Sequence, residues 1–172
     1  MKRAIRLTIN GKEYEMPVSP NQTLVDLLRY DLGLTGTKKG CDLGDCSSCT
    51  VIMDGRPVNS CLVLVVQANG RDILTIEGLE TGEGLHPVQQ SFTDRGAIQC
   101  GFCTSGMILS GKALLDRNPE PNESDIRMAL SGNLCRCTGY QKIVEGVEDA
   151  GQKVRQLAGH GDKLMGEKEG SR

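Results

Sequence analysis

The sequence has little material for a large aromatic core. Its 172 residues include no tryptophan, three tyrosines and two phenylalanines, and hydrophobic residues make up 38% of the chain. We therefore expect something other than aromatic packing to help hold the fold. The length is enough for one ordinary domain or two small ones.

Strong net charge and long apolar runs are also absent. The formal net charge is −2, with 20 basic and 22 acidic residues, which gives no indication of binding to nucleic acid or to an anionic membrane. No stretch approaches the roughly 20 apolar residues of a membrane span. The first ten residues have no apolar region behind their early cations, so they do not resemble a secretory signal. We expect a cytoplasmic chain without membrane insertion.

The first part of the chain reads as a small α+β unit. Apolar and polar residues alternate through residues 4–10, which predicts a half-buried strand, and Asn10-Gly11 is typical of a hairpin turn into a second strand. Thr23 is expected to cap a short helix. Two further strands are predicted around Asp54-Gly55, and another within residues 71–79.

A glycine-rich segment at residues 78–87 marks a change of pattern. Beyond it apolar residues recur with a helical period, and the four short helices expected there suggest a compact bundle. Small residues in the second of these helices would let another backbone approach closely, namely Ser105, Gly106, Ser110 and Gly111. The expected division is a first domain, a linker, a helical domain and a polar tail, at residues 1–79, 80–86, 87–158 and 159–172.

Cysteine is abundant, with eight residues that fall into two groups of four. Reducing compartments disfavour structural disulfides, and cysteines there more often bind metals or carry out redox chemistry. The first group has the spacing C-x4-C-x2-C-x11-C and comprises Cys41, Cys46, Cys49 and Cys61. The second has the spacing C-x2-C-x31-C-x-C and comprises Cys100, Cys103, Cys135 and Cys137.

The first spacing is that of plant-type ferredoxins, which predicts a [2Fe–2S] cluster. Four thiolates must converge from a loop that wraps the cluster, and Gly40 and Gly44 allow that loop to take positive φ and to bring N–H groups close to the sulfurs. Zinc sites usually present paired C-x2-C knuckles, which this spacing matches poorly. A disulfide framework is disfavoured in a chain of this length without a secretory signal.

The second group is less decisive on spacing alone. CGFC at the start of a helix also suits a thioredoxin-like redox pair, although that interpretation leaves CRC unexplained. Four sulfurs could hold zinc. A second [2Fe–2S] cluster would use all four cysteines, and the three alternatives stay open at this point.

Three stretches, GCDLGDCSSCTV, QCGFCTSGM and GNLCRCTGY, together resemble the small iron–sulfur subunit of the molybdenum hydroxylases, the xanthine oxidase family. The resemblance extends from the first strand to the last helix, and the order, spacing and flanking residues of the motifs are highly specific. It implies an α+β chain with an N-terminal β-grasp, plant-type ferredoxin domain followed by an all-α four-helix-bundle domain. Each domain would hold one [2Fe–2S] cluster.

The resemblance also implies partners. Such a subunit passes electrons between a molybdopterin–Mo centre in a large subunit and FAD in a medium subunit of an oxidoreductase, without catalytic residues of its own. Matching positions make Gln99 and Cys137 the expected pterin contacts. The expected assembly is a heterotrimer, or a dimer of heterotrimers. Substrate specificity would lie in the large subunit, and either direction of electron flow is compatible with the sequence.

Two positions depart from the family's common pattern. Ser47 stands where glycine is common, and Thr104-Ser105 stands where Thr-Pro is common. Neither position is an expected ligand, so the cluster expectations are unchanged. Ser47 nevertheless removes a permissive backbone position from the cysteine loop.

Other polar residues are expected to have no ligand role. His86 and His160 are expected to be solvated residues of the linker and tail, and Asp42 and Asp45 to be loop residues that hydrogen-bond the local backbone. Two competing functions remain to be weighed. The first is a free-standing two-cluster ferredoxin that serves several redox partners, and the second is a thiol or zinc protein built on the helical part.

Overall fold

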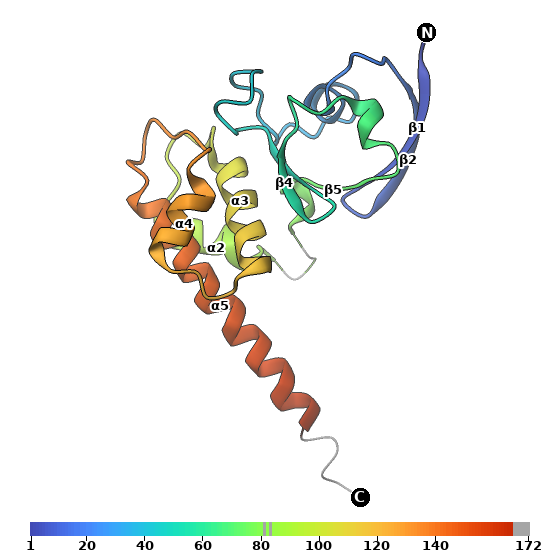
Figure 1. Ribbon diagram of the computed structural model, residues 1–172. Coiled ribbons are helices and arrows are strands. Elements are labelled where there is room, and N and C mark those ends of the chain that lie inside the picture. Colours follow the sequence, from blue (N-terminus) through green and yellow to red (C-terminus); the bar gives the residue numbers. More distant parts are fainter. Residues whose placement is uncertain (81, 83, 167–172) are drawn as a thin grey trace, which may run out of the picture.

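The computed structural model describes residues 1–80, 82 and 84–166, with side chains described as far as residue 157. A five-stranded sheet with short helices is followed by a set of longer helices beside it (Figure 1). The strands are β1 (Arg3–Ile9), β2 (Lys12–Val18), β3 (Thr50–Met53), β4 (Arg56–Asn59) and β5 (Asp72–Leu74). The α-helices are α1 (Leu24–Asp26), α2 (Pro87–Asp94), α3 (Thr104–Arg117), α4 (Glu123–Leu130) and α5 (Gln141–Gly166). Short turns of π or 3₁₀ helix are η1 (Leu27–Asp31), η2 (Val65–Ala68) and η3 (Ile76–Gly78).

The sheet is mixed, with the strand order β2-β1-β5-β3-β4. Strands β1 and β5 are parallel, whereas the other neighbouring pairs are antiparallel. Both predicted hairpin turns are present, because Asn10 and Gly11 have φ of 52° and 76°, and Asp54 and Gly55 have φ of 49° and 77°. Positive φ at both central residues is what a two-residue hairpin of type I′ requires.

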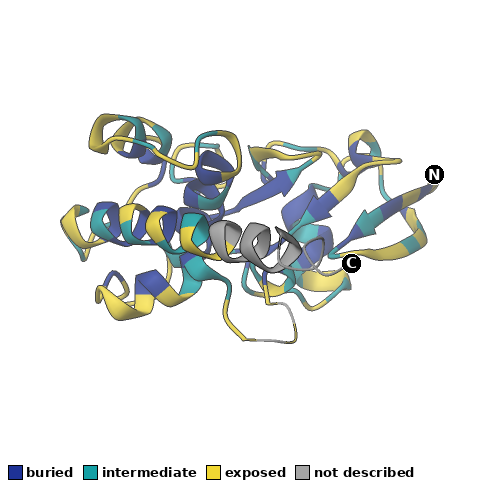
Figure 2. Cartoon of the chain, turned by 90° about the horizontal axis from the view of Figure 1, so that it is seen from below, coloured by how far each residue is buried: buried dark blue, intermediate teal, exposed yellow. Residues whose placement is uncertain are grey.

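The predicted alternation in the first strand is confirmed by burial. Ile5, Leu7 and Ile9 are 4%, 1% and 1% exposed, and they pack with buried leucines of α1 and η1. Thr23 caps α1 as expected, because its hydroxyl accepts the N–H of Asp26. The π turn that follows was not predicted. Figure 2 shows buried residues along the strands and exposed residues in the connecting loops.

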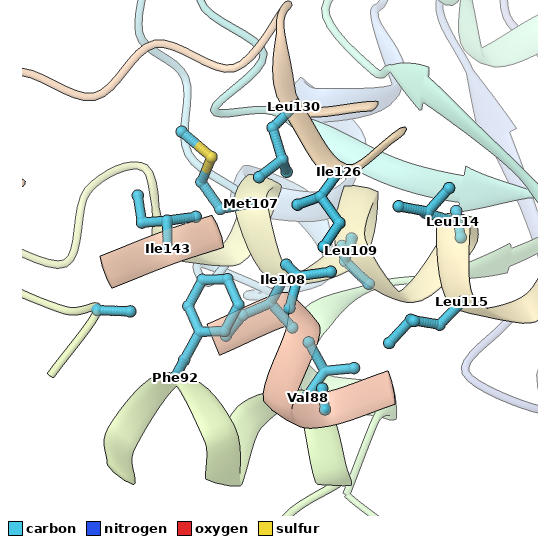
Figure 3. Packing of buried hydrophobic residues seen from close by; sticks show 14 of the residues in the cluster. Val88, Phe92, Met107, Ile108, Leu109, Leu114, Leu115, Ile126, Leu130 and Ile143 are labelled. Atoms are coloured by element: carbon cyan, nitrogen blue, oxygen red, sulfur yellow. The ribbon is translucent and has the colours of Figure 1, made fainter. Parts of the chain in front are cut away.

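A second core lies between helices α2 to α5 and includes Ile52 of β3, so it extends to the sheet. It is built mainly from aliphatic side chains and Met107, which converge with Phe92 in Figure 3. Phe92 is the only aromatic among the buried residues that the structure describes, as expected for a chain so poor in aromatics. The α+β class with a helical second part is confirmed, whereas the more specific four-helix bundle stays a prediction.

The linker and the tail are partly covered by the described residues. Residues 81 and 83 of the linker and residues 167–172 of the tail lie outside them, and α5 continues as far as Gly166, inside the predicted tail. The boundaries of the division therefore stay predictions. Among the described residues, no helix is both long and apolar enough to pass through a bilayer.

His86 is half-buried, which corrects the expectation of a solvated residue. It precedes Pro87 at the start of α2, and its Nδ1 atom accepts the N–H of Val88 at 3.2 Å. Burial and the nearby charge of Lys112 lower the pKa of His86, which favours the neutral ring that this acceptor role needs. The residue therefore caps a helix.

The sheet and the helical part meet along α3. A side-chain carbon at Gly106 would clash with the carbonyl oxygen of Ser47, and one at Gly111 would lie 2.9 Å from Val147. The prediction that small residues of this helix let another backbone approach closely is confirmed at Gly106, whereas the neighbour of Gly111 is the side chain of Val147. Gly106 faces the first cysteine loop, and Gly111 faces α5.

We expect Gly106→Ala to lower the free energy of unfolding. In a helix interior, alanine is more favourable than glycine by roughly 1 kcal/mol. At Gly106 this gain is outweighed, because packing a new carbon against the carbonyl of Ser47 costs about 1–3 kcal/mol. Gly132→Ala is the matched control, because its new carbon would lie at an ordinary 3.5 Å from Ser47 Oγ. Denaturant unfolding of both variants checks the prediction, and equal stability of the two would contradict it.

Helices α2 and α5 are joined by ion pairs around Asp149, whose side chain is 12% exposed. Arg95 donates to one carboxylate oxygen of Asp149, and Lys153 lies 2.9 Å from the other. Lys153 also contacts Asp94 at 2.6 Å. Burial would raise the pKa of Asp149, but the hydrogen bonds from Arg95 and Lys153 outweigh it and hold the pKa below its usual value.

Asp149→Asn is therefore expected to reduce the free energy of unfolding by about 1–3 kcal/mol at neutral pH. Since the pKa of Asp149 is lowered by folding, its contribution is present above about pH 4 and is lost as the pH falls. The difference from wild type should shrink in acid. Glu148→Gln, a neighbouring exposed carboxylate, is the control and should change little. A loss that is independent of pH would refute the assignment.

Candidate metal centres

The first cysteine group lies on two segments of the sheet domain. Cys41, Cys46 and Cys49 occupy the loop before β3, and Cys61 follows β4. Cys49 and Cys61 are buried and cluster with Val25 of α1, whereas the other two are half-buried. All eight cysteines of the chain are free thiols.

The loop turns back on itself through residues in the left-handed region. Asp42, Gly44 and Ser47 have φ of 59°, 86° and 50°. Gly40 leaves room for the sulfur, because a side-chain carbon there would lie 2.9 Å from Cys46 Sγ and 3.3 Å from the ring of Phe102. Glycine at this position therefore lets Cys46 Sγ and the ring of Phe102 lie close to the backbone.

Backbone N–H groups surround one sulfur of this loop. Those of Leu43, Asp45 and Cys46 point at Cys41 Sγ, at 3.4, 3.3 and 3.4 Å. These hydrogen bonds, led by that of Leu43, lower the pKa of Cys41 to about 7. A sulfur that accepts several N–H bonds is suited to carrying negative charge, as a ligand to iron must.

The four sulfurs of the first group interact as two pairs. Cys41 interacts with Cys46, and Cys61 interacts mainly with Cys49 and more weakly with Cys41. Burial raises the pKa of Cys61 to about 12, and the neighbouring Cys49 adds to the rise. Metal binding must therefore displace a proton from Cys61. In a [2Fe–2S] cluster four sulfurs divide between two irons, and the observed pairs suit that division.

The second group is assembled from the two ends of helices. Cys100 and Cys103 precede α3, and Cys135 and Cys137 lie on the loop between α4 and α5. Cys100 pairs with Cys137 and Cys103 with Cys135. The structure thus brings CRC beside CGFC, which favours a site that uses all four sulfurs over an isolated two-cysteine redox pair.

The two inner thiols of this group differ in environment. Burial, followed by the effect of Cys135, raises the pKa of Cys103 to about 12. Burial would also raise the pKa of Cys135, but hydrogen bonds from Thr138 lower it overall. The hydroxyl oxygen of Tyr140 accepts the N–H of Cys135 at 2.9 Å and so fixes the loop. The four cysteines therefore gather near the start of α3 as two pairs of thiols.

Within the described part of the chain, no group of three or more His, Cys, Asp or Glu side chains is placed to hold a metal ion. The thiols of both groups meet in pairs instead. The role of each cysteine as a cluster ligand accordingly stays a prediction.

The two groups lie next to each other, which the sequence did not indicate. The N–H of Leu134, the residue before Cys135, donates to the carbonyl oxygen of Cys46 at 3.1 Å. The ring of Phe102, between Cys100 and Cys103, faces Gly40. A second interdomain bond runs from Asn133 to Ser47. The only hint in the sequence was that Asn133 and Leu134 belong to the GNLCRC motif.

The expectation for the loop carboxylates needs correction. Asp42 pairs with Lys39 at 3.0 Å instead of bonding to the backbone, and Lys39 also contacts Asp26 of α1 at 2.9 Å. Asp45 contributes its backbone N–H to Cys41 Sγ. The ion pairs of Lys39 therefore tie the cysteine loop to α1. The side chain of His160 lies outside the described residues.

Gln99 and Cys137 are both exposed. Gln99 directly precedes Cys100, whose thiol is hydrogen-bonded to Cys137, so the two expected pterin contacts belong to the same end of the helical part. Their pterin role stays a prediction.

Comparison with known proteins identifies both halves of the chain. Residues 7–77 match the family described as "2Fe-2S iron-sulfur cluster binding domain", and residues 75–148 match the family described as "[2Fe-2S] binding domain". The first match contains the first cysteine group, and the second match contains the other.

Whole-chain relatives agree with these matches. The chain is 51% identical to the nicotinate dehydrogenase small FeS subunit of Eubacterium barkeri, over 83% of this chain and 90% of the relative. It is 50% identical to the nicotine 6-hydroxylase small subunit of Paenarthrobacter nicotinovorans, over 85% of this chain and 88% of the relative. Among solved structures it is similar to a chain of quinoline 2-oxidoreductase from Pseudomonas putida 86, with a TM-score of 0.86 and 46% identity. The match covers 90% of this chain and 97% of that chain. The chain therefore belongs to the family of small [2Fe–2S] iron–sulfur subunits of the molybdenum hydroxylases.

Proposed function

We propose that each cysteine group of this electron-transfer subunit holds one [2Fe–2S] cluster and that the chain relays electrons between them. The proposed ligands of the first cluster are Cys41, Cys46, Cys49 and Cys61, and those of the second are Cys100, Cys103, Cys135 and Cys137. When bound, such clusters supply one-electron acceptors and donors. The pairing of the sulfurs and the N–H groups around Cys41 support this assignment.

The observation that carries the proposal is the direct contact between the loops that hold the two cysteine groups. Leu134, which precedes the proposed ligand Cys135 of the second cluster, donates a hydrogen bond to Cys46, a proposed ligand of the first cluster. Phe102 fills the space between the CGFC segment and Gly40. These contacts place the loops of the two groups side by side, which supports electron transfer between them.

The surroundings of the two groups differ in a way that suits a relay. Cys49 and Cys61 lie behind Val25, away from water. The three N–H groups at Cys41 stabilise the extra negative charge that a reduced cluster carries. Cys100 and Cys137, in contrast, are exposed at the surface, so the second group is open toward a partner.

Exposed apolar side chains surround that opening. Ile98, Phe102 and Leu134 are 40%, 47% and 54% exposed, and a cluster of such residues marks an interaction surface. We propose that it docks the large subunit, with Gln99 and Cys137 contacting molybdopterin. The names of relatives as small or beta subunits support a multi-subunit complex.

The remaining parts of the proposal concern the assembly. FAD is placed in a medium subunit near the first cluster, in a heterotrimer that can pair with a second copy. The eight free thiols support a cytoplasmic location. The sheet order is compatible with a β-grasp domain, and the shared core of α2 to α5 supports a four-helix bundle.

Cys103→Ser is expected to remove only the second cluster. Because serine is a poor ligand for iron at this position, the iron content should fall from about four to about two per chain. The electron paramagnetic resonance (EPR) signal of one reduced cluster should disappear while the other is kept. Cys49→Ser is the reciprocal variant and should lose the other signal. Unchanged iron and spectra in either variant would contradict the ligand assignment.

Leu134→Lys is expected to prevent docking of the large subunit. The wild-type chain, purified gently from its own host, should carry about four irons together with molybdenum, flavin and two further polypeptides. The variant should keep its iron, because the backbone N–H of Leu134 is unchanged, but lose the molybdenum. Met128→Lys on α4, at a side chain that is 74% exposed, is the control and should keep it.

Iron without molybdenum or partners in the wild-type preparation would instead support a free-standing ferredoxin. Equal amounts of molybdenum with both lysine variants would show that this surface is not the docking site. Zinc in place of iron in the helical part would refute the second cluster.

A further inference from the structure

Asn133 lies at the junction of the two domains and is 4% exposed. Its Nδ2 group donates to the carbonyl oxygen of Ser47 at 3.2 Å, and its Oδ1 atom accepts the hydroxyl of Ser110 at 3.0 Å. The three residues come from the loop after α4, the first cysteine loop and α3. Both ends of the amide are therefore used, and one end reaches across the domain boundary.

A second hydrogen bond, from Leu134, lies beside that of Asn133. Leu134 donates to the carbonyl oxygen of Cys46, while Asn133 donates to that of Ser47. Two consecutive residues before Cys135 thus bond the backbone carbonyls of two consecutive residues of the first cysteine loop, Cys46 and Ser47. The two domains also share apolar packing, because Ile52 of β3 belongs to the core of the helical part. The two adjacent hydrogen bonds add a defined spacing and orientation of the loops that carry Cys46 and Cys135.

The hydroxyl of Ser110 determines which way the amide faces. Because Ser110 donates to Oδ1, the donor Nδ2 is directed toward Ser47. Gly106, one turn earlier on α3, has no side chain and lets the carbonyl of Ser47 come close. Helix α3 therefore positions both the amide and the carbonyl that it bonds.

A cavity of about 210 Å³ adjoins this contact, lined by residues that include Ser47, Thr50 and Asn133. Such a space is large enough for water. If the amide were removed, water could solvate the carbonyl of Ser47 and replace the interdomain bond. The contact would then loosen without unfolding either domain.

We propose that Asn133 is a positioning residue that fixes the spacing of the two clusters, with Ser110 orienting its amide. This inference rests on the proposed function, because it requires a cluster in each domain. Asn133 touches neither cluster in this role. It acts through the loops that carry Cys46 and Cys135.

The test compares Asn133→Ala and Ser110→Ala with Asn118→Ala. Asn118 belongs to the same domain, and its Oδ1 accepts the N–H of Glu120, so the control also loses one amide hydrogen bond. Iron content and the EPR signals of the separate clusters establish that both clusters are present. The decisive readouts are the magnetic splitting between the two reduced clusters and the hydrogen exchange of the Leu134 amide.

In Asn133→Ala we expect the splitting to broaden or disappear while the g values of each cluster are kept. Exchange at Leu134 should accelerate about tenfold, as for the loss of one net hydrogen bond. Ser110→Ala should shift both readouts in the same direction by less, and Asn118→Ala should match wild type. A role confined to stability of the helical domain would change melting without changing the splitting.

The outcomes distinguish a failure of the proposed function from a failure of the positioning role of Asn133. A wild-type chain with fewer than two clusters would refute the proposed function. Two clusters with no splitting in wild type, or with the same splitting and exchange in all variants, would refute the positioning role alone. If Asn133→Ala loses iron, the splitting and the exchange at Leu134 in the milder variant Ser110→Ala decide whether the positioning role holds.

Discussion

One constraint shapes both halves of the structure, which is that cysteines from separate segments must be brought next to one another. In the first domain the chain meets it by turning through left-handed positions at Asp42, Gly44 and Ser47. The loop is held by its own N–H bonds to Cys41 Sγ and also by its neighbours. Lys39 ties it to Asp26 of α1, and Asn59 donates to the carbonyl of Gly44. The sheet and α1 thus add a frame to the cysteine loop.

In the second domain helix ends satisfy the same constraint. The segment before α3 and the loop after α4 each bring two sulfurs, and the core of α2 to α5 sets the distance between them. Because helix ends lie at the edge of a helical layer, this group opens to the surface, where Cys100 and Cys137 are exposed. In the first group only Cys49 and Cys61, which pack with Val25 of α1, are buried, and Cys41 and Cys46 are half-buried. The first group is therefore less exposed than the second, as its place beside α1 explains.

Local patterns predicted most of the elements, since their causes are local. The hairpins at Asn10-Gly11 and Asp54-Gly55, the cap at Thr23 and the spacing of the cysteines could all be read without knowing the fold. The contacts of Asn133 and Phe102 could not, because they depend on how two domains meet. His86 was misread for a related reason, since its burial comes from packing outside the linker. The candidate ligands were therefore predictable, whereas their relative placement was not.

Ser47 shows how local strain and domain contact are connected. A non-glycine residue in the left-handed region costs on the order of 1–2 kcal/mol and persists only when its surroundings determine it. Ser47 has φ of 50° and is 8% exposed, and its carbonyl accepts bonds from Thr50 and Asn133. Glycine, common here in the family, would adopt the conformation without strain but would depend less on those bonds. In this chain the residue that bends the cysteine loop is thus held by the other domain, so the shape of the first site and the position of the second are determined together.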